Sequence, residues 1–366
     1  METGTYKGAS IGRTGRGDWG HGLHLGLLDN ASVEVVAVAD EDENGRLKAQ
    51  SQLQASCAYV DYRQMLDREQ PDIVTIGPRW TDCHLAMVLD CIESGAHVYC
   101  EKPMTWNLQD ADQIVTAADS ADRKVAVAHQ AVYLPRVQDL RDQLKEGCIG
   151  ALEQLRAVGK QDRRSGGEDM IVLGTHLFNL MRFLAGDVEW MSSHVTVERR
   201  AFVQRDITEG GEPIGPIAGD SVESFFSFAS GVSGFFTSRS EQPNDGHYGL
   251  DIIGSEGRIA FRGGSGGEMM RYPHAAFMPH DATRAWRPME GLPDAPLSDG
   301  NTRAIADLVA AIEEDRPPLS SARDARSALE MVLGAYEAQI TGARVTFPMA
   351  NRHHPLLAWK EGYYDG

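Results

Sequence analysis

The first third of the chain alternates between β-rich and helical patterns, and this alternation constrains the fold more than any other feature. β-rich runs are expected at 9–11, 33–39, 72–76, 96–100 and 125–128. Helical patterns are expected after the first run, with Leu23, Leu27 and Leu28 on one face, and at 44–56, 81–94 and 107–121. Strands that alternate with helices are typical of a parallel sheet with helical crossovers. The sequence therefore predicts an α/β fold, with a doubly wound, Rossmann-like parallel sheet over residues 1–135.

A glycine-rich loop follows the first expected strand and fits a dinucleotide fingerprint in two registers. Gly15, Gly17 and Gly20 match G-x-G-x-x-G literally, whereas Gly12, Thr14 and Gly17 match it with threonine in the middle place. The second register is preferred because Gly12 directly follows the strand, as the fingerprint requires. Backbone N–H groups and a helix N-terminus would then hold a pyrophosphate, with the Thr14 hydroxyl as an added donor.

An acidic residue ends the next expected strand at close to the spacing that the fingerprint requires. Asp40 is placed to hold the ribose hydroxyls, and Glu41 beside it would repel a 2′-phosphate. Arg16 keeps the alternative open, because arginine suits phosphate. NAD is therefore favoured over NADP.

The expected strand at 96–100 ends in Glu101-Lys102-Pro103. Proline has no N–H for the ladder, so the strand stops there and Lys102 lies at the carboxyl edge of the sheet. Ligands bind at that edge in open parallel sheets. Lys102 is thus a candidate general acid, general base or substrate-binding group.

Composition excludes several classes of partner. Acidic residues outnumber basic ones, 53 against 35, and the net charge of −18 disfavours nucleic acid and anionic membranes. The five cysteines form no C-x-x-C pair, which fits a reducing cytoplasm, and no metal site is expected. No apolar leader or membrane-spanning stretch is recognised, so a cytoplasmic location is predicted.

The rest of the chain predicts a second domain. Helical patterns cover 136–147, 172–185, 302–315 and 323–340, and β-rich runs cover 152–158, 188–202, 221–228, 232–238, 248–253 and 258–261. Consecutive strands without helices between them indicate an open, mostly antiparallel sheet. We expect a domain at 136–345, closed by the last two helices, and a docked tail at 346–366. The glycine patch at 263–267 is expected to be a loop.

Taken together, these motifs resemble the glucose–fructose oxidoreductase/inositol dehydrogenase/MocA-type family. The resemblance rests on Gly12…Gly17, Asp40, Gly77-Pro78 followed by His84, Glu101-Lys102-Pro103, Ile149-Gly150, Gly174-Thr175-His176, Gly254-Ser255-Glu256-Gly257-Arg258 and the closing Pro317-Pro318…Ala328-Leu329-Glu330. It covers nearly the whole chain. It implies a Rossmann domain, an α/β domain whose open sheet often forms an oligomer interface, a nicotinamide cofactor and a sugar or cyclitol substrate. A homodimer or homotetramer is therefore expected.

The resemblance also implies roles for particular residues. Lys102 would lie beside the nicotinamide and the reacting hydroxyl, after a peptide bond to Pro103 that is commonly cis in such proteins. His176 matches the family's catalytic histidine, and Asn179, three residues on, would bind a neighbouring hydroxyl. The remaining cofactor candidates are Gly15, Gly77, Pro78, Trp80, His84, Glu101 and Gln130. The remaining substrate candidates are Tyr133, Lys160, Arg163 and Arg164.

Packing or solvation is the alternative for several of these candidates. His84 fits equally a capping or packed histidine, and Trp80 a core or surface aromatic. The basic segment at 160–167 fits equally a solvated loop.

One departure from the family pattern leaves the chemistry open. Val172 stands where many members carry an aspartate four residues before the histidine, and the nearest acids are Glu168 and Asp169. The main hypothesis is oxidation of a secondary hydroxyl of a sugar, glycoside or cyclitol, with Lys102 and His176 sharing the proton transfer. A redox-neutral glycosidase or lyase acting through a transient keto-sugar, and a non-catalytic sugar or NAD sensor, are the alternatives.

Overall fold

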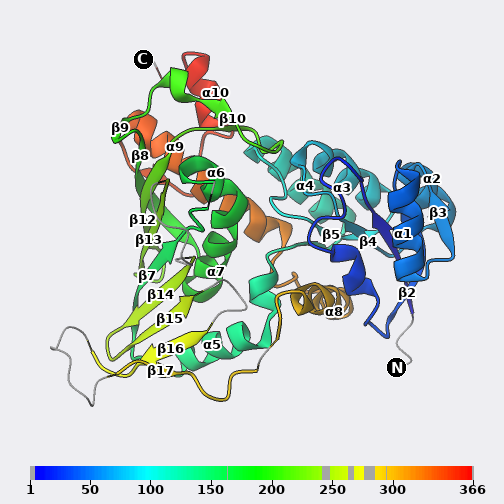
Figure 1. Cartoon of the computed structure of the whole chain (residues 1–366), viewed down its shortest axis with the longest axis horizontal. Coiled ribbons are helices and arrows are strands. Elements are labelled where there is room, and N and C mark those ends of the chain that lie inside the picture. Colours follow the sequence, from blue (N-terminus) through cyan, green and yellow to red (C-terminus); the bar gives the residue numbers. More distant parts are fainter. Residues whose placement is uncertain are drawn as a thin grey trace. The chain divides into compact units, whose positions relative to one another are not determined.

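The structure is a computed structural model, which describes residues 5–162, 164–240, 248–262, 268–275, 285–293 and 295–364. The chain divides into two compact units (Figure 1). The first unit runs to Tyr133 and also takes in Glu212–Ile214 and Leu297–Arg326. The second unit contains Leu134–Gly211, Gly215–Pro296 and the chain from Ser327 onward.

The first unit is built on a six-stranded parallel sheet with the order β3-β2-β1-β4-β5-β6. Its strands are β1 (Tyr6–Ile11), β2 (Val33–Ala39), β3 (Cys57–Tyr59), β4 (Ile73–Ile76), β5 (His97–Cys100) and β6 (Val125–Val127). The chain reverses its direction of travel across the sheet between β1 and β4, which is the place where such sheets bind ligands. The predicted doubly wound parallel sheet is confirmed.

Helices cross over between these strands. They are α1 (Glu43–Leu53), α2 (Tyr62–Glu69), α3 (His84–Glu93) and α4 (Leu108–Ala121), with the short 3-10 helices η1 (Leu23–Leu27) and η2 (Thr81–Cys83); a third 3-10 helix, η3 (Gln130–Tyr133), follows β6. Side chains cap the first turns of α1, α2 and α4, because Asp42, Asp61 and Asn107 accept hydrogen bonds from backbone N–H groups there.

The helical pattern predicted after the glycine loop forms a 3-10 helix, and its three leucines do not share one buried face. Only the short η1 forms, and it begins at Leu23 after Gly22, whose φ is +76°. Leu23 and Leu27 are fully buried, but Leu28 is 43% exposed. Glycines at 20 and 22 interrupt the α pattern, because each adopts a left-handed conformation.

The second unit is built on a mixed, mostly antiparallel sheet with the order β17-β16-β15-β14-β7-β13-β12-β8-β18. Only β7 and β13 pair in parallel among the described strands of this sheet. The strands are β7 (Leu152–Val158), β8 (Val188–Val197), β9 (Arg200–Ala201), β12 (Ser221–Phe228), β13 (Ser233–Arg239), β14 (Gly249–Gly254), β15 (Arg258–Arg262), β16 (Met269–Tyr272), β17 (Arg287–Pro288) and β18 (Val345–Thr346). A separate pair joins β10 (Thr208–Glu209) to β11 (Pro216–Ile217). The predicted open, mostly antiparallel sheet is confirmed; the glycine patch at 263–267 lies outside the described residues.

Helices of the second unit cover one face of this sheet, as Figure 1 shows. The helical segments of the whole unit are α5 (Pro135–Lys145), α6 (Gly166–Asp169), the π-helical turn η4 (Met170–Gly174), α7 (Thr175–Ala185), η5 (Gln204–Asp206), α9 (Ala322–Thr341, which begins in the first unit) and α10 (Pro355–Lys360). The core lies between α7 and the sheet, where Phe178 packs edge-on against Phe226 and Phe236. Alternate residues of β12 are buried, so its other face is left open.

The last part of the chain packs differently from our expectation. The helix predicted at 302–315 forms as α8 (Asp299–Glu313), but it belongs to the first unit and does not close the second. Gly300 explains this position, because a Cβ there would lie 2.6 Å from the Gln130 side chain. The segment after residue 346 belongs to the second unit, where Gln204 donates a hydrogen bond to the Trp359 carbonyl.

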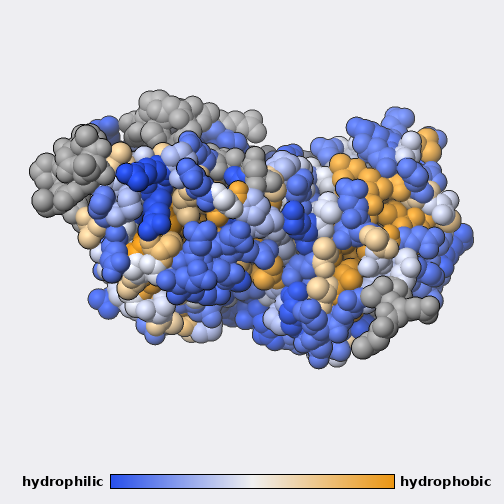
Figure 2. All heavy atoms as spheres, turned by 90° about the horizontal axis from the view of Figure 1, so that it is seen from below, coloured by the Kyte–Doolittle hydropathy of each residue, from blue (hydrophilic) through white to orange (hydrophobic). Residues whose placement is uncertain are grey.

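The surface is largely hydrophilic, with apolar residues gathered in a few areas of the face that Figure 2 shows. Large exposed apolar side chains of the first unit include Leu25, Leu28 and Leu47. No helix within the described residues is long and apolar enough to cross a bilayer.

Candidate active site

A cavity of about 530 Å³ lies at the carboxyl ends of β1 and β2, beside the switch point of the parallel sheet. Its walls come from the strand ends and from the start of α2, and they include Gly12, Asp40, Glu41, Tyr62 and Arg63. A pocket of this size at this position fits a nucleoside. The wall contains three carboxylates, those of Asp40, Glu41 and Asp61.

The glycine loop lies against this cavity as a tight turn. Arg13 and Asp18 form an antiparallel bridge, and the Arg13 guanidinium pairs with Asp82 at 2.8 Å. Gly12 has no room for a side chain, because a Cβ there would meet the Trp19 ring at 2.1 Å. Gly15 faces open space, but its φ of +79° is a left-handed conformation, so the turn itself favours a glycine there. Gly12 is required by its packing against Trp19, and the register of the fingerprint stays a prediction.

Gly17 packs against the loop that follows β4. Its φ is +89°, and a Cβ there would lie 2.7 Å from the Trp80 backbone nitrogen. The Arg79 N–H donates to the Gly17 carbonyl at 3.0 Å. The loop after β1 is thus joined to the loop after β4, while Arg16 is exposed at its tip.

Carboxylates hold the N–H groups that we expected at a pyrophosphate. The N–H and hydroxyl of Thr14 donate to Asp40, with 2.7 Å between Thr14 Oγ1 and Asp40 Oδ2. The Gly15 N–H donates to Asp18 at 2.8 Å. Asp40 also accepts the N–H of Asp42 at 3.0 Å and is only 2% exposed. The carboxylate predicted at the ribose is thus buried at the cavity and already has protein donors.

His84 is fully buried between two backbone segments. Its Nε2 lies 2.7 Å from the Pro78 carbonyl, and its Nδ1 lies 3.0 Å from the Met104 carbonyl. The ring therefore ties Gly77-Pro78 to the segment after Pro103. This geometry favours the packed interpretation of His84, and its contact with a cofactor stays a prediction. Trp80 is half-buried at the start of η2.

The Glu101-Lys102-Pro103 segment follows β5 and is buried. Glu101 is 0% exposed and Lys102 is 3% exposed, and the Lys102–Pro103 peptide is cis. One Glu101 oxygen accepts the N–H and Nδ1–H of His21, at 2.7 and 2.6 Å, and the other accepts the Lys102 N–H at 2.9 Å. Burial alone would raise the pKa of Glu101, but the bonds from His21 and the charge of Lys102 outweigh burial and lower the pKa of Glu101.

Two further candidates of the first unit are buried within η3. Gln130 is 3% exposed and packs against Gly300. Tyr133 is 1% exposed, and its hydroxyl accepts the Ser320 N–H at 3.2 Å. Tyr133 therefore takes part in the packing of the first unit, and its contact with substrate stays a prediction.

The predicted histidine of the second unit lies on a continuous helical run. His176 is half-buried on α7, and Asn179, one turn on, is 2% exposed. Val172, which replaces the usual aspartate, is buried within the π-helical turn. Turns of this kind often lie at functional sites. Asn179 Nδ2 is buried without a hydrogen-bond partner among the described residues.

Asp169 is the buried carboxylate nearest in sequence to this histidine. It is 0% exposed, and burial raises the pKa of Asp169 despite a 2.6 Å hydrogen bond from the Ser238 hydroxyl. Its other oxygen, Oδ1, is buried without a partner in the described part of the chain. The Gln161 N–H also donates to Asp169, so this carboxylate orders the start of the 160–167 loop.

The basic loop is partly neutralised by its own acid. Arg164 forms a two-pronged ion pair with Asp162 through Nε and Nη2, at 3.1 and 2.7 Å, and Lys160 lies 3.5 Å from the same carboxylate. The hydrogen bond from Arg164 holds the pKa of Asp162 well below its usual range. Arg163 lies outside the described residues. These contacts favour a structured loop, and a role in substrate binding stays a prediction.

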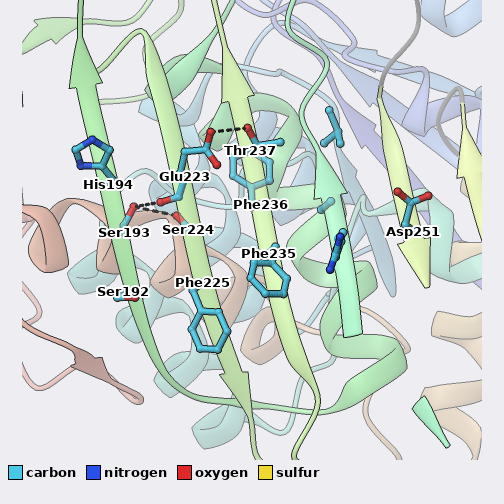
Figure 3. Close-up of a pocket in the computed structure, with 13 residues that line it drawn as sticks. Ser192, Ser193, His194, Glu223, Ser224, Phe225, Phe235, Phe236, Thr237 and Asp251 are labelled. Carbon is cyan, nitrogen blue, oxygen red and sulfur yellow. Dashed lines mark hydrogen bonds between the residues drawn. The ribbon is translucent and has the colours of Figure 1, made fainter. Parts of the chain in front are cut away.

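The open face of the large sheet carries a second hollow, of about 690 Å³ (Figure 3). Phe225 and Phe235 lie side by side on neighbouring strands, with ring centroids 5.3 Å apart, among Ser192, His194 and Glu223. None of the predicted site residues lines it. It is therefore a surface feature of the sheet, separate from the candidate residues of α7.

Sequence reasoning missed two residues that hold the candidate site. His21 binds Glu101, and Asn301 of α8 donates to the His21 carbonyl at 3.0 Å. The run Gly20-His21-Gly22 was a local signal for His21, whereas nothing in sequence joins Asn301 to residue 21. No cluster of three or more potential metal ligands occurs within the described residues.

Comparison with known proteins finds two matching family models. Residues 11–129 match the model described as "Oxidoreductase family, NAD-binding Rossmann fold", and residues 156–347 match "Oxidoreductase family, C-terminal alpha/beta domain" of the same family, Gfo/Idh/MocA. Myo-inositol 2-dehydrogenase of Thermotoga maritima is 24% identical over 68% of this chain and 74% of its own length. D-apiose dehydrogenase of Paraburkholderia graminis is 29% identical over 55% of this chain and 56% of its own.

Solved structures share the fold over almost the whole chain. A levoglucosan dehydrogenase in complex with NADH superposes with a TM-score of 0.74 at 19% identity, over 94% of this chain and all of its own. An NAD-binding oxidoreductase from Klebsiella pneumoniae gives the same TM-score and identity over 93% and 99%.

Proposed function

The chain belongs to the Gfo/Idh/MocA family of NAD-dependent oxidoreductases, and from this premise we propose that it oxidises a secondary hydroxyl of a sugar, glycoside or cyclitol. The observation that carries the proposal is the placement of Lys102. This lysine is buried directly after β5, at the same edge of the sheet as the nucleoside-sized cavity. The relatives that are named myo-inositol 2-dehydrogenase and D-apiose dehydrogenase support a polyhydroxylated substrate.

The residues at the cavity fit the adenosine half of NAD. Asp40 lies at the end of β2 beside Gly12, where a ribose diol would be bound, and the pocket has room for a nucleoside. Glu41 and Asp61 add negative charge that would repel a 2′-phosphate, so NAD is preferred over NADP. Titration with both dinucleotides tests this preference, and tighter binding of NADP would contradict it.

Bound NAD supplies the hydride acceptor. The chain's own part is to orient the reacting hydroxyl and to accept its proton. In this proposal Lys102 Nζ takes that role, and His176 shares the proton transfer. Asn179, whose buried Nδ2 has no hydrogen-bond partner among the described residues, binds an adjacent hydroxyl.

A substrate screen with site variants tests the proposal. Sugars, cyclitols and aryl glycosides are offered with NAD, and both NADH and released aglycone are followed. Lys102→Ala and His176→Ala should each lower kcat by roughly 10²–10⁴-fold, the usual contribution of general acid–base groups. Lys124→Ala, at an exposed ion pair with Asp315, and His353→Ala, at an exposed position, are the matched controls.

Two outcomes would overturn the proposal. One is wild-type turnover in both site variants. The other is aglycone release from an enzyme that retains NAD and forms no net NADH, since that result would establish the redox-neutral reaction instead.

We also propose a homodimer or homotetramer that pairs through the open sheet face. This face carries three neighbouring aromatic side chains, those of Trp190, Phe225 and Phe235. The ring centroids of Trp190 and Phe225 lie 5.2 Å apart. Light scattering should give an oligomer for wild type and a smaller species for Phe235→Glu. Leu47→Glu, which changes an exposed apolar residue of α1, is the matched control. A monomeric wild type refutes this assignment.

A further inference from the structure

A chain of hydrogen bonds within the first unit reaches Lys102 through a residue that the proposed mechanism does not use. The Tyr99 hydroxyl donates to Asn301 Oδ1 at 2.9 Å, and Asn301 Nδ2 donates to the His21 carbonyl at 3.0 Å. His21 then donates to Glu101 from both its backbone and its ring, and Glu101 accepts the Lys102 N–H. His21 is thus held at its carbonyl and holds the carboxylate beside the lysine.

The backbone around His21 is built for this contact. Gly20 has a φ of +57°, and a Cβ there would lie 2.2 Å from the Gly77 carbonyl oxygen and 2.4 Å from Glu101 Oε1. The backbone therefore approaches Glu101 as closely as a glycine allows. Asn301 is 3% exposed, so its hydrogen bond to the His21 carbonyl lies in the interior of the first unit.

The Glu101 carboxylate depends on these donors. It is fully buried, and a buried carboxylate without hydrogen bonds is strongly disfavoured in its charged form. A carboxylate only accepts hydrogen bonds, so His21 Nδ1 carries the proton in this pair. The His21 side chain is 45% exposed, so a half-exposed ring holds a buried carboxylate.

We propose that His21 is a positioning residue for Lys102: its ring fixes the Glu101 carboxylate, whose second oxygen fixes the Lys102 backbone. The inference rests on the proposed function of Lys102. Loss of the ring contact leaves Glu101 Oε1 with the His21 backbone N–H as its donor, so the carboxylate, and with it the Lys102 backbone, is held less firmly. Lys102 Nζ then loses its alignment with the reacting hydroxyl, while the nucleoside cavity is unchanged.

Two substitutions separate the hydrogen bond from the bulk of the ring. His21→Ala removes the ring donor, whereas His21→Asn places an amide Nδ2 close to the position of Nδ1 and keeps the donor. His21→Ala should lower kcat roughly tenfold to a hundredfold, as expected when a reacting group is displaced by about 1 Å. His21→Asn should recover kcat to within about threefold of wild type, and the affinity for NAD should be equal in all three proteins.

A second measurement needs no substrate. Lys102 is 3% exposed, so an amine-acylating reagent should label it slowly in wild type. Peptide mass spectrometry, with the exposed Lys145 as internal reference, should show Lys102 labelled severalfold faster in His21→Ala and at the wild-type rate in His21→Asn.

The outcomes distinguish this inference from the function on which it rests. Wild-type kcat and labelling in His21→Ala, or an equal defect in folded His21→Asn, would overturn the positioning role. If His21→Ala does not fold, a wild-type kcat and labelling rate in His21→Asn support the role, and a defect there refutes it. Full turnover in Lys102→Ala would instead refute the proposed function itself.

Discussion

Replacement of Thr14 by valine tests how the Asp40 carboxylate shares its hydrogen bonds between the protein and NAD. A carboxylate has about four acceptor positions. Asp40 already receives the Thr14 N–H, the Thr14 hydroxyl and the Asp42 N–H. About one position is left for a ribose hydroxyl, so a ribose that uses both of its hydroxyls must displace Thr14 Oγ1.

The size of the effect follows from that competition. A hydrogen bond to a charged group contributes about 1.5–3 kcal/mol, and most of this is exchanged when one donor replaces another. Thr14→Val removes the competing hydroxyl at nearly constant volume. We expect NAD to bind more tightly by about 1 kcal/mol, or roughly fivefold in Kd. The ligand-free protein should lose about 1 kcal/mol of stability, because Asp40 loses a donor.

Calorimetric titration with NAD measures the first quantity, and thermal melting with and without NAD measures the second. Thr14→Ser keeps the hydroxyl and is the matched control, with affinity close to wild type. Weaker binding by Thr14→Val would refute the reasoning, because it would mean that this hydroxyl serves the pyrophosphate, as the fingerprint suggested.

Three further predictions concern stability. Gly17→Ala should lower the free energy of unfolding in urea by at least about 2 kcal/mol, because φ at this position is +89° and backbone atoms block the added Cβ. Gly15→Ala should lower it by about half as much, because a Cβ at Gly15 faces open space. Burial and nearby cationic charge lower the pKa of His97 from 6.5 to about 4, so folding favours the neutral ring. The free energy of unfolding should fall by up to about 3 kcal/mol as pH drops from 6.5 to about 4, and His97→Gln should lessen this fall. The raised pKa of Asp169 means that stability falls as pH rises above the ordinary value of 3.8, and Asp169→Asn should flatten that part of the unfolding profile.

The parallel sheet could be predicted because its strands carry their own signal. The run Ile73–Ile76 is apolar and β-branched apart from the hydroxyl of Thr75, it is buried throughout, and Asp72 and Gly77 bound it. A strand that is buried on both faces needs no knowledge of its neighbours to be recognised. Lys102 follows from the same logic, because the end of a strand determines where the next residue lies.

The glycine loop shows where this logic fails. Its sequence matches the fingerprint, yet no α-helix begins there, since Gly20 and Gly22 take left-handed conformations that an α-helix does not contain. Thr14 donates to Asp40, which lies 26 residues further along the chain. The local sequence of the loop therefore did not show which carboxylate accepts this hydrogen bond. Local pattern cannot decide between a pyrophosphate and a carboxylate as the acceptor, because both are anions.

The same limit explains why α8 was assigned to the wrong unit. Its amphipathic pattern requires an apolar partner but does not say which one. The decision comes from small contacts: Gly300 lies against Gln130, and Asn301 bonds to both Tyr99 and His21. These contacts join residues about 170 to 280 positions apart, so a segment late in the chain completes the network beside Lys102. A truncation before residue 297 would therefore remove part of the first unit, and it should impair NAD binding even though residues 11–129 contain the whole nucleotide-binding match.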